Sequence, residues 1–263
     1  MLTKGEAVML NVNKVSKVYT GNIAYRALTD IEFTIEKGEF VGIMGPSGSG
    51  KTTLLNMIAT IDEPTTGSIL VDGRDTGKLK KHELARFRRR ELGFVFQDFN
   101  LLHTLTVEEN IVLPLTLDGH KVQDMKEKAR KIADELGIAG ILNKRTYEIS
   151  GGQAQRAAIA RAMIHTPKLL LADEPTGNLD SKSARDVMEM LERINHTQRT
   201  TMMLVTHDAM AASYCHRVIF IRDGQQYTEI NRGDNRQTFF QKIIDTLSLL
   251  GGHANDISSI RVQ

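Results

Sequence analysis

The start of the chain alternates between apolar and polar positions. The alternation is loose over residues 9–20, and a second one covers residues 24–35 before the pair Lys37-Gly38. A period of two places successive side chains on opposite faces of an extended chain, as in a half-buried strand. The pattern therefore predicts antiparallel strands at this end of the chain.

Further along, short apolar runs alternate with helical patterns. The strand-type runs are residues 39–44, 68–71, 93–97, 168–174, 200–205 and 218–221. Helical signals dominate residues 80–143, where Thr106 and Glu109 have the spacing of a capping box, and return in residues 151–164 and 183–195. Regular alternation of strands and helices predicts an α/β fold with a parallel core sheet. A predicted turn at Asp223-Gly224 ends the alternating pattern.

Apolar residues recur at helical spacing in the tail, residues 231–263. They are Phe239, Phe240, Ile243, Ile244, Leu247 and Leu250. This spacing predicts a short amphipathic helix, for which packing on the body of the protein is commoner than docking on a partner. The residues after Gly252 are expected to fray.

The composition is that of a globular protein. Of 263 residues, 41 % are apolar, which is enough for a sizeable core in one large domain or slightly more. The sequence contains no run of about 18 apolar residues and no signal-peptide pattern, so we expect a cytoplasmic protein without a membrane span. The net charge of +2, with 25 % charged residues, argues against a dedicated nucleic-acid binder.

Two local features have ordinary structural interpretations. The single cysteine, Cys215, cannot form an internal disulfide and has no neighbours at metal-ligand spacing, so we expect it to pack in the core. Four arginines, Arg86, Arg88, Arg89 and Arg90, are expected to lie on a solvated helix face, with contacts to anions as the less common alternative.

The strand predicted at residues 39–44 leads into a glycine-rich turn of the form G-x-x-x-x-G-K-T. The turn residues are Gly45, Pro46, Ser47, Gly48, Ser49, Gly50, Lys51, Thr52 and Thr53. Such a turn points backbone N–H groups at an anion and adds the partial positive charge of a helix N-terminus. We therefore predict nucleotide binding, with Lys51 on the β- and γ-phosphates and the Thr52 hydroxyl on Mg²⁺.

Other residues at the ends of elements are candidates for the same site. Asp173 and Glu174 follow four apolar residues of a predicted buried strand, and ligands of open α/β sheets bind at that edge. Tyr19 precedes a turn, where its ring could stack on a base, although packing is the commoner role of a lone tyrosine. The run Ser150-Gly151-Gly152-Gln153 opens a helix and is either a second anion site or a glycine-rich cap.

In their order and spacing, these motifs resemble the ATP-binding subunits of ABC transporters. The likeness covers about residues 8–230 and also includes Gln97 after an apolar strand, Gly177-Asn178-Leu179-Asp180 and His207. It implies a P-loop NTPase fold of the ABC ATPase type, with an N-terminal antiparallel β-subdomain, a parallel core sheet and an inserted helical subdomain at about residues 98–165. Residues 1–230 would form the ATP-binding domain, and residues 231–263 the tail.

The resemblance also implies a role for each motif residue in ATP hydrolysis. Asp173 would hold Mg²⁺, and Gln97 would sense the metal and its water. Glu174 would orient or deprotonate the attacking water, which must lie in line with the γ-phosphate. His207 would hydrogen-bond the γ-phosphate, and Tyr19 would stack on the base of ATP.

The family arrangement implies a homodimer with shared sites. ATP would bind residues 45–53 of one subunit and Ser150-Gly151-Gly152-Gln153 of its neighbour. Two departures are mild: Ile149 stands where leucine is commoner, and Ala154 stands where a basic residue is common and receives no role.

Within the family, residues 94–102 and 172–180 resemble the branch of macrolide exporters and lipoprotein-release systems. Residues 211–215, 217–221 and 234–241 are similar to the ATPase of bacitracin-type resistance transporters. The resemblance implies a separate large membrane permease, a position at the cytoplasmic face of the membrane, and resistance to peptide antibiotics. Lipoprotein release or macrolide export is the alternative within the family.

Two alternatives share the same ATPase chemistry but belong to other classes. A DNA-repair or chromosome-organising ATPase would have a coiled coil or extra domains, and a ribosome-associated ABC protein would have a second set of motifs. Neither feature is visible in the sequence. We therefore expect no nucleic-acid partner.

Overall fold

The computed structural model describes residues 8–21 and 24–251, so the fraying expected after Gly252 falls outside the described residues. One sheet is formed by four strands in the order β2-β1-β4-β5. These are β1 (Val8–Tyr19), β2 (Tyr25–Glu36), β4 (Thr66–Val71) and β5 (Arg74–Asp75). All three pairings are antiparallel, which confirms the interpretation of the early alternation.

The core sheet has the order β10-β9-β3-β8-β7-β6. Its strands are β3 (Phe40–Met44), β6 (Leu92–Val95), β7 (Leu169–Asp173), β8 (Thr201–Val205), β9 (Arg217–Arg222) and β10 (Gln225–Asn231). The pairings from β9 to β6 are parallel, and β10 adds an antiparallel edge. The sequence analysis missed β10 because most of its side chains are exposed, although the predicted turn at Asp223-Gly224 is present with positive φ at both residues.

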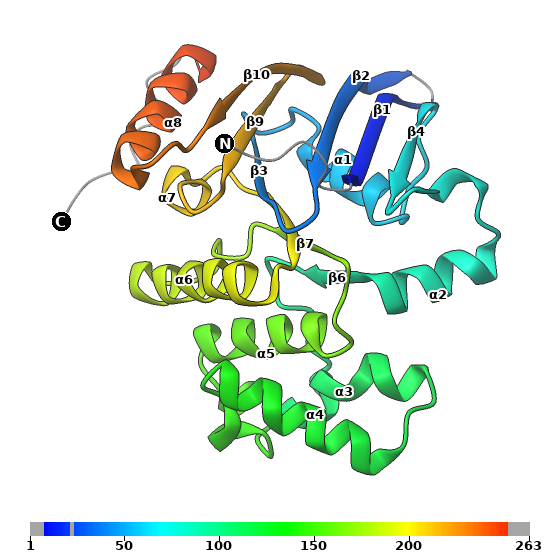
Figure 1. Cartoon of the computed structure of the whole chain (residues 1–263), viewed down its shortest axis with the longest axis vertical. Helices are drawn as coiled ribbons and strands as arrows, with labels where there is room; N and C mark the ends of the chain where they lie inside the picture. Colours follow the sequence, from blue (N-terminus) through cyan, green and yellow to red (C-terminus); the bar gives the residue numbers. More distant parts are fainter. Residues whose placement is uncertain (1–7, 22–23, 252–263) are drawn as a thin grey trace.

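Alternate residues of the core strands face two different layers. Leu169 and Leu171 pack in one hydrophobic cluster with helix α1 (Lys51–Ile58) and the first sheet. Leu170 and Ala172 pack in a second cluster with α5 (Gly151–Met163) and α6 (Ser181–Gln198). Because successive side chains of a strand point to opposite faces, α1 and α5 cover opposite faces of the core sheet (Figure 1).

The helical region forms the lower part of the molecule in Figure 1. It follows α2 (Lys81–Glu91) and β6 and contains α3 (Val107–Leu117) and α4 (Val122–Glu135), which pack with α5. The predicted capping box is present at the start of α3. The Thr106 hydroxyl accepts from the Glu109 amide at 3.2 Å, and the Glu109 carboxylate accepts from the Thr106 amide at 2.7 Å.

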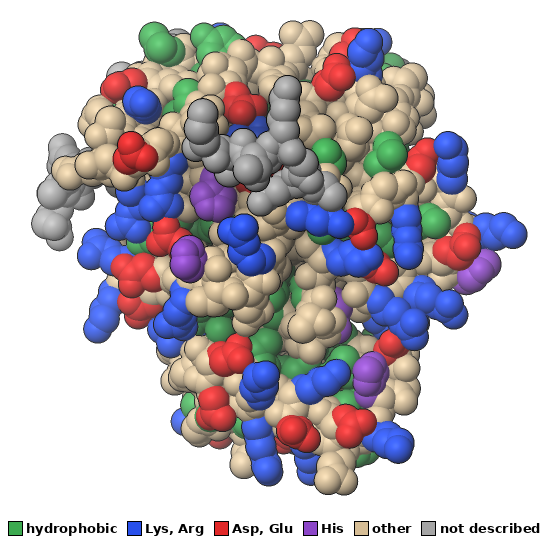
Figure 2. Space-filling model, viewed as in Figure 1, with side chains coloured by type: hydrophobic (Ala, Val, Ile, Leu, Met, Phe, Trp, Pro, Cys, Tyr) green, Lys and Arg blue, Asp and Glu red, His purple; other side chains and the backbone are tan. Residues whose placement is uncertain are grey.

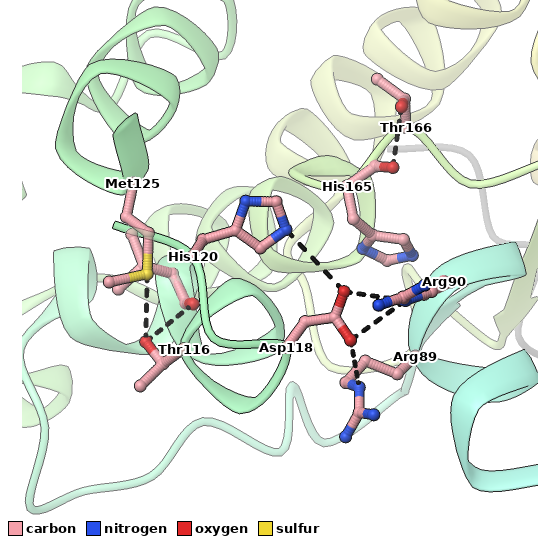
Figure 3. A network of polar contacts seen from close by, with 9 residues as sticks. Arg89, Arg90, Thr116, Asp118, His120, Met125, His165 and Thr166 are labelled. Atoms are coloured by element: carbon pink, nitrogen blue, oxygen red, sulfur yellow. Dashed lines mark hydrogen bonds and ion pairs between the residues drawn. The ribbon is translucent and has the colours of Figure 1, made fainter. Parts of the chain in front are cut away.

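Arg86, Arg88 and Arg90 of α2 are exposed, as the sequence predicts, and three of the four arginines of α2 also contact neighbouring segments. Arg89 and Arg90 donate to the Asp118 carboxylate, which follows α3, and His120 lies 3.8 Å from the same carboxylate (Figure 3). Arg88 donates to the carbonyl of Thr60. These contacts join α2 to neighbouring segments from an exposed face. Their acceptors lie 28 and 29 residues away in the sequence, where no local pattern reveals them.

The C-terminal part packs on the core through two helices. Helix α8 (Arg236–Gly251) contacts α7 (Ala209–Ala212) and β10, and buries Phe239, Ile243 and Leu250. Cys215 is fully buried in the same cluster, as expected.

Charged side chains of both signs are mixed on the face seen in Figure 2, which agrees with the nearly balanced composition. Within the two described ranges, no helix is both long enough and apolar enough to cross a membrane.

Candidate functional site

The glycine-rich turn connects β3 to α1, and its glycines are needed for different reasons. A Cβ atom at Gly45 would lie 1.9 Å from the carbonyl oxygen of Ile221, and one at Gly50 would lie 2.6 Å from the Leu28 side chain, so both positions are closed by packing. Gly48 has φ +77° with open space beside it. The loop is therefore fixed at its two ends and open in the middle, where a ligand can approach the backbone.

Lys51 is the buried cation of this loop. Its Nζ donates to the carbonyls of Gly45 and Pro46, both at 2.9 Å, and burial lowers the pKa of Lys51 while Glu174 and Asp173 oppose that shift. The Ser49 hydroxyl is buried and has no hydrogen-bond partner among the described residues. No side chain caps the start of α1, so its backbone donors remain available for an anion.

Two carboxylates stand at the end of β7, close enough to interact electrostatically with Lys51. Burial, together with the charge of Glu174, raises the pKa of Asp173, and Lys51 acts in the opposite direction. The exposed Thr52 hydroxyl lies at the start of α1. One carboxylate and one hydroxyl fit Mg²⁺, which keeps several water ligands and completes its shell with phosphate oxygens.

The Glu174 carboxylate makes three polar contacts with Thr206 and His207, the two residues that follow β8. Its Oε1 accepts from the His207 amide at 3.0 Å and lies 2.7 Å from His207 Nδ1, while its Oε2 accepts from the Thr206 hydroxyl at 3.0 Å. Glu174 has φ +45°, an uncommon conformation for a residue with a side chain, and its amide donates to the carbonyl of Val205. The sequence analysis did not find Thr206, because a threonine at a strand end carries no signal of its own.

Gln97 contacts a residue of the segment after Glu174. Its side-chain amide donates to Asn178 Oδ1 at 3.5 Å, and Asn178 Nδ2 donates to the Gln97 carbonyl at 3.2 Å and to Asp98 at 2.8 Å. Gln97 follows β6, the glycine-rich turn follows β3, Glu174 follows β7 and His207 follows β8. Since these strands are parallel, the structure brings all four motifs to one edge of the sheet, where ligands of such folds bind.

Tyr19 lies beside α1 and is about two-fifths exposed. Its hydroxyl donates to Asp62 at 2.8 Å, and Lys17 Nζ stands 4.8 Å from the ring centroid. Burial and the bond to Asp62 raise the pKa of Tyr19, whereas a hydrogen bond with Thr53 lowers it. The ring is therefore next to the glycine-rich turn, as stacking on a base requires.

Ser150-Gly151-Gly152-Gln153 begins α5 and forms a capping box. The Ser150 hydroxyl accepts from the Gln153 amide at 3.3 Å, and Gln153 Oε1 accepts from the Ser150 amide at 3.0 Å. A Cβ at Gly152 would lie 3.0 Å from the Ser183 hydroxyl, so this end of α5 packs closely on α6. Within the part of the chain that the structure describes, no hydrogen bond joins this run to residues 45–53. Helices α1 and α5 cover opposite faces of the sheet.

A cavity of about 740 Å³ lies elsewhere, at the opposite ends of β7 and β8. Residues lining it include Lys37, Lys128, Lys131, Lys168 and Arg199. None of the motif residues lines this cavity. The polar cluster at the sheet edge is therefore the better candidate for chemistry.

Comparisons with known proteins identify relatives of this chain. The family model described as ABC transporter matches residues 28–177. The ABC transporter ATP-binding protein YxdL of Bacillus subtilis is 60 % identical, over 97 % of this chain and 100 % of its own. The bacitracin export ATP-binding protein BceA of Halalkalibacterium halodurans is 52 % identical, over 94 % of this chain and 99 % of its own. A solved dimer of the ATP-binding cassette MJ0796 with ADP and Pi is 38 % identical, covers 86 % of this chain and 100 % of its own, and has a TM-score of 0.79.

Proposed function

Because the chain belongs to the ATP-binding proteins of ABC transporters, and so is an ATP-hydrolysing subunit, we propose that it works as a homodimer that drives a separate permease. The observation that carries the proposal is the convergence of four motifs at one sheet edge, around the buried Lys51.

In the proposed site, the phosphates of ATP bind residues 45–53. Lys51, which now donates to two loop carbonyls, would turn to the β- and γ-phosphates. Asp173, Thr52 and Gln97 would hold Mg²⁺, whose charge offsets that of the phosphates when bound. Tyr19 would stack on the base.

Glu174 is the proposed base for the attacking water. Its carboxylate is mostly buried at the sheet edge, and its contact with His207 ties it to the residue that we assign to the γ-phosphate. The His207 side chain is 73 % exposed, so it is free to reach a ligand above the edge. In P-loop enzymes catalysis rests mainly on such positioning and on charge stabilisation.

The placement of the two helix N-termini supports the proposed homodimer. Since α1 and α5 cover opposite faces of the core sheet, Ser150-Gly151-Gly152-Gln153 is proposed to meet the phosphates bound by a second copy. The solved dimer of the relative MJ0796 with ADP and Pi supports this arrangement.

We further propose that the permease confers resistance to bacitracin-like peptide antibiotics, with the chain at the cytoplasmic face of the membrane. The relative named as a bacitracin export ATP-binding protein supports this choice. A lipoprotein-release or macrolide-export role remains the second candidate, favoured by residues 94–102 and 172–180.

The test is to co-purify the chain with its membrane permease and to measure ATP hydrolysis in lipid nanodiscs. Bacitracin should stimulate phosphate release, and the Glu174→Gln complex is the control for contaminating ATPases. If a macrolide or a lipoprotein stimulates hydrolysis and bacitracin does not, the proposed substrate is wrong and the second candidate takes its place. Stimulation by DNA that disappears with salt would contradict the transporter role.

A further inference from the structure

Thr206 lies at the end of β8, directly before His207, and is fully buried. Its amide donates to the carbonyl of Ile43 on β3 at 3.2 Å. The residue is therefore held by the central strands of the core sheet, and its side chain has little freedom to move.

The Thr206 hydroxyl has one partner on each side. It accepts from the Asp208 amide at 3.0 Å and donates to Glu174 Oε2 at 3.0 Å. Because a carboxylate oxygen can only accept, the hydroxyl proton must point at Glu174. The bond to Asp208 fixes the direction of that proton further.

The two oxygens of Glu174 consequently have unlike surroundings. Oε2 is bound by a buried residue of the sheet, whereas Oε1 is bound by His207, whose side chain is mostly exposed. A nucleotide that engages the His207 ring would remove the ring contact of Oε1, while the His207 amide stays on Oε1 and Thr206 stays on Oε2.

We propose that Thr206 is a positioning residue for ATP hydrolysis, which holds Glu174 Oε2 so that Oε1 faces the attacking water. This inference rests on the proposed role of Glu174. In the step, a water O–H bond breaks and its proton passes to Oε1, while the water oxygen bonds to the γ-phosphorus. The bond from that phosphorus to the bridging oxygen breaks, and ADP leaves with the electron pair.

The test compares Thr206→Val, which keeps the shape and loses the hydroxyl, with Thr206→Ser, which keeps the hydroxyl. We expect Thr206→Val to lower kcat about 10- to 100-fold with KM for ATP unchanged within about 2-fold, because orientation is lost but binding is not. Thr206→Ser should stay within about 3-fold of wild type. Equal kcat in all three proteins would overturn the inference, and so would a loss in both variants. If Thr206→Val does not fold, Thr206→Ala replaces it in the same comparison.

A double-mutant cycle separates positioning from a general structural role. In a Glu174→Gln background, Thr206→Val should cause no further loss of the residual rate, since Thr206 acts through the carboxylate. A further 10-fold loss would overturn the inference. If Glu174→Gln itself hydrolyses ATP at the wild-type rate, the proposed function of the site fails instead, so the two failures are distinguishable.

Discussion

Among the described helices, α1 and α5 both begin at glycine-containing motifs, and the two helix starts are built in opposite ways. At the start of α1 no side chain caps the backbone, Gly45, Gly48 and Gly50 have positive φ, and a buried lysine stands close to two carboxylates. At the start of α5 the Ser150 and Gln153 side chains satisfy each other's amides.

The difference favours the start of α1 as the end that performs chemistry. An uncapped helix start leaves donors unsatisfied until an anion binds, and the groups around α1 can act on that anion. At the start of α5 the capping box already satisfies the amides of Ser150 and Gln153, and leaves those of Gly151 and Gly152 to a ligand. We interpret α1 as the reaction centre and α5 as a recognition element for a second subunit.

The largest expected effect concerns the reaction centre. Glu174→Gln should lower ATP turnover about 10²- to 10⁴-fold, because the site loses its base. ATP binding should persist, and a nucleotide-dependent dimer should accumulate. Phosphate release measures the turnover, ATP titration measures the binding, and sedimentation measures the dimer. Normal turnover would remove Glu174 from the catalytic role.

Mixed dimers test whether the two ends meet across subunits. Lys51→Ala and Ser150→Arg homodimers should both be inactive. A dimer with one copy of each variant contains one intact pair of ends and should recover about half of the wild-type rate. The measurement is turnover of tandem-tagged heterodimers, and a complete lack of recovery would contradict the arrangement in trans.

Tyr19 further separates the start of α1 from the start of α5. We propose that its ring stacks on the base of ATP, and we assign no such ring to the α5 end. Tyr19→Ala should raise KM for ATP about 5- to 100-fold, the range expected for loss of one stacked base. Tyr19→Phe is the matched control, since it keeps the ring and loses the hydroxyl, with its bonds to Asp62 and Thr53. An equal loss in both variants would assign the effect to the hydroxyl.

The smallest effect is on stability. Ser150→Ala and Thr106→Ala each remove the hydroxyl of a capping box, on α5 and α3 respectively. Each should lower the free energy of unfolding by about 1 kcal/mol in denaturant titrations. Only Ser150→Ala should also lower turnover, and equal turnover in the two variants would remove α5 from the site.

Local patterns predicted much of the fold. The strand and helix periods, the glycine-rich turn and the capping box at Thr106 depend on neighbours in sequence. The edge strand β10 and the contacts of Asp118 with the arginines of α2 depend on tertiary packing. The hydrophobic periodicity of the sequence does not encode that packing. The same limit applies to the site: Glu174 could be named from its motif, whereas Thr206 was found only from the bond that it donates.

The burial of Cys215 has a practical consequence. Its thiol lies against β3, where a Cβ on Gly42 would be 3.2 Å from the sulfur, and burial raises the pKa of Cys215 well above its ordinary value. Thiolate, the form that reacts with maleimides, is therefore scarce at neutral pH. The native sequence therefore gives a low background for thiol labelling. A cysteine engineered at an exposed position outside residues 45–53, such as Gln123 on α4, would take the label alone and report on subunit pairing by fluorescence.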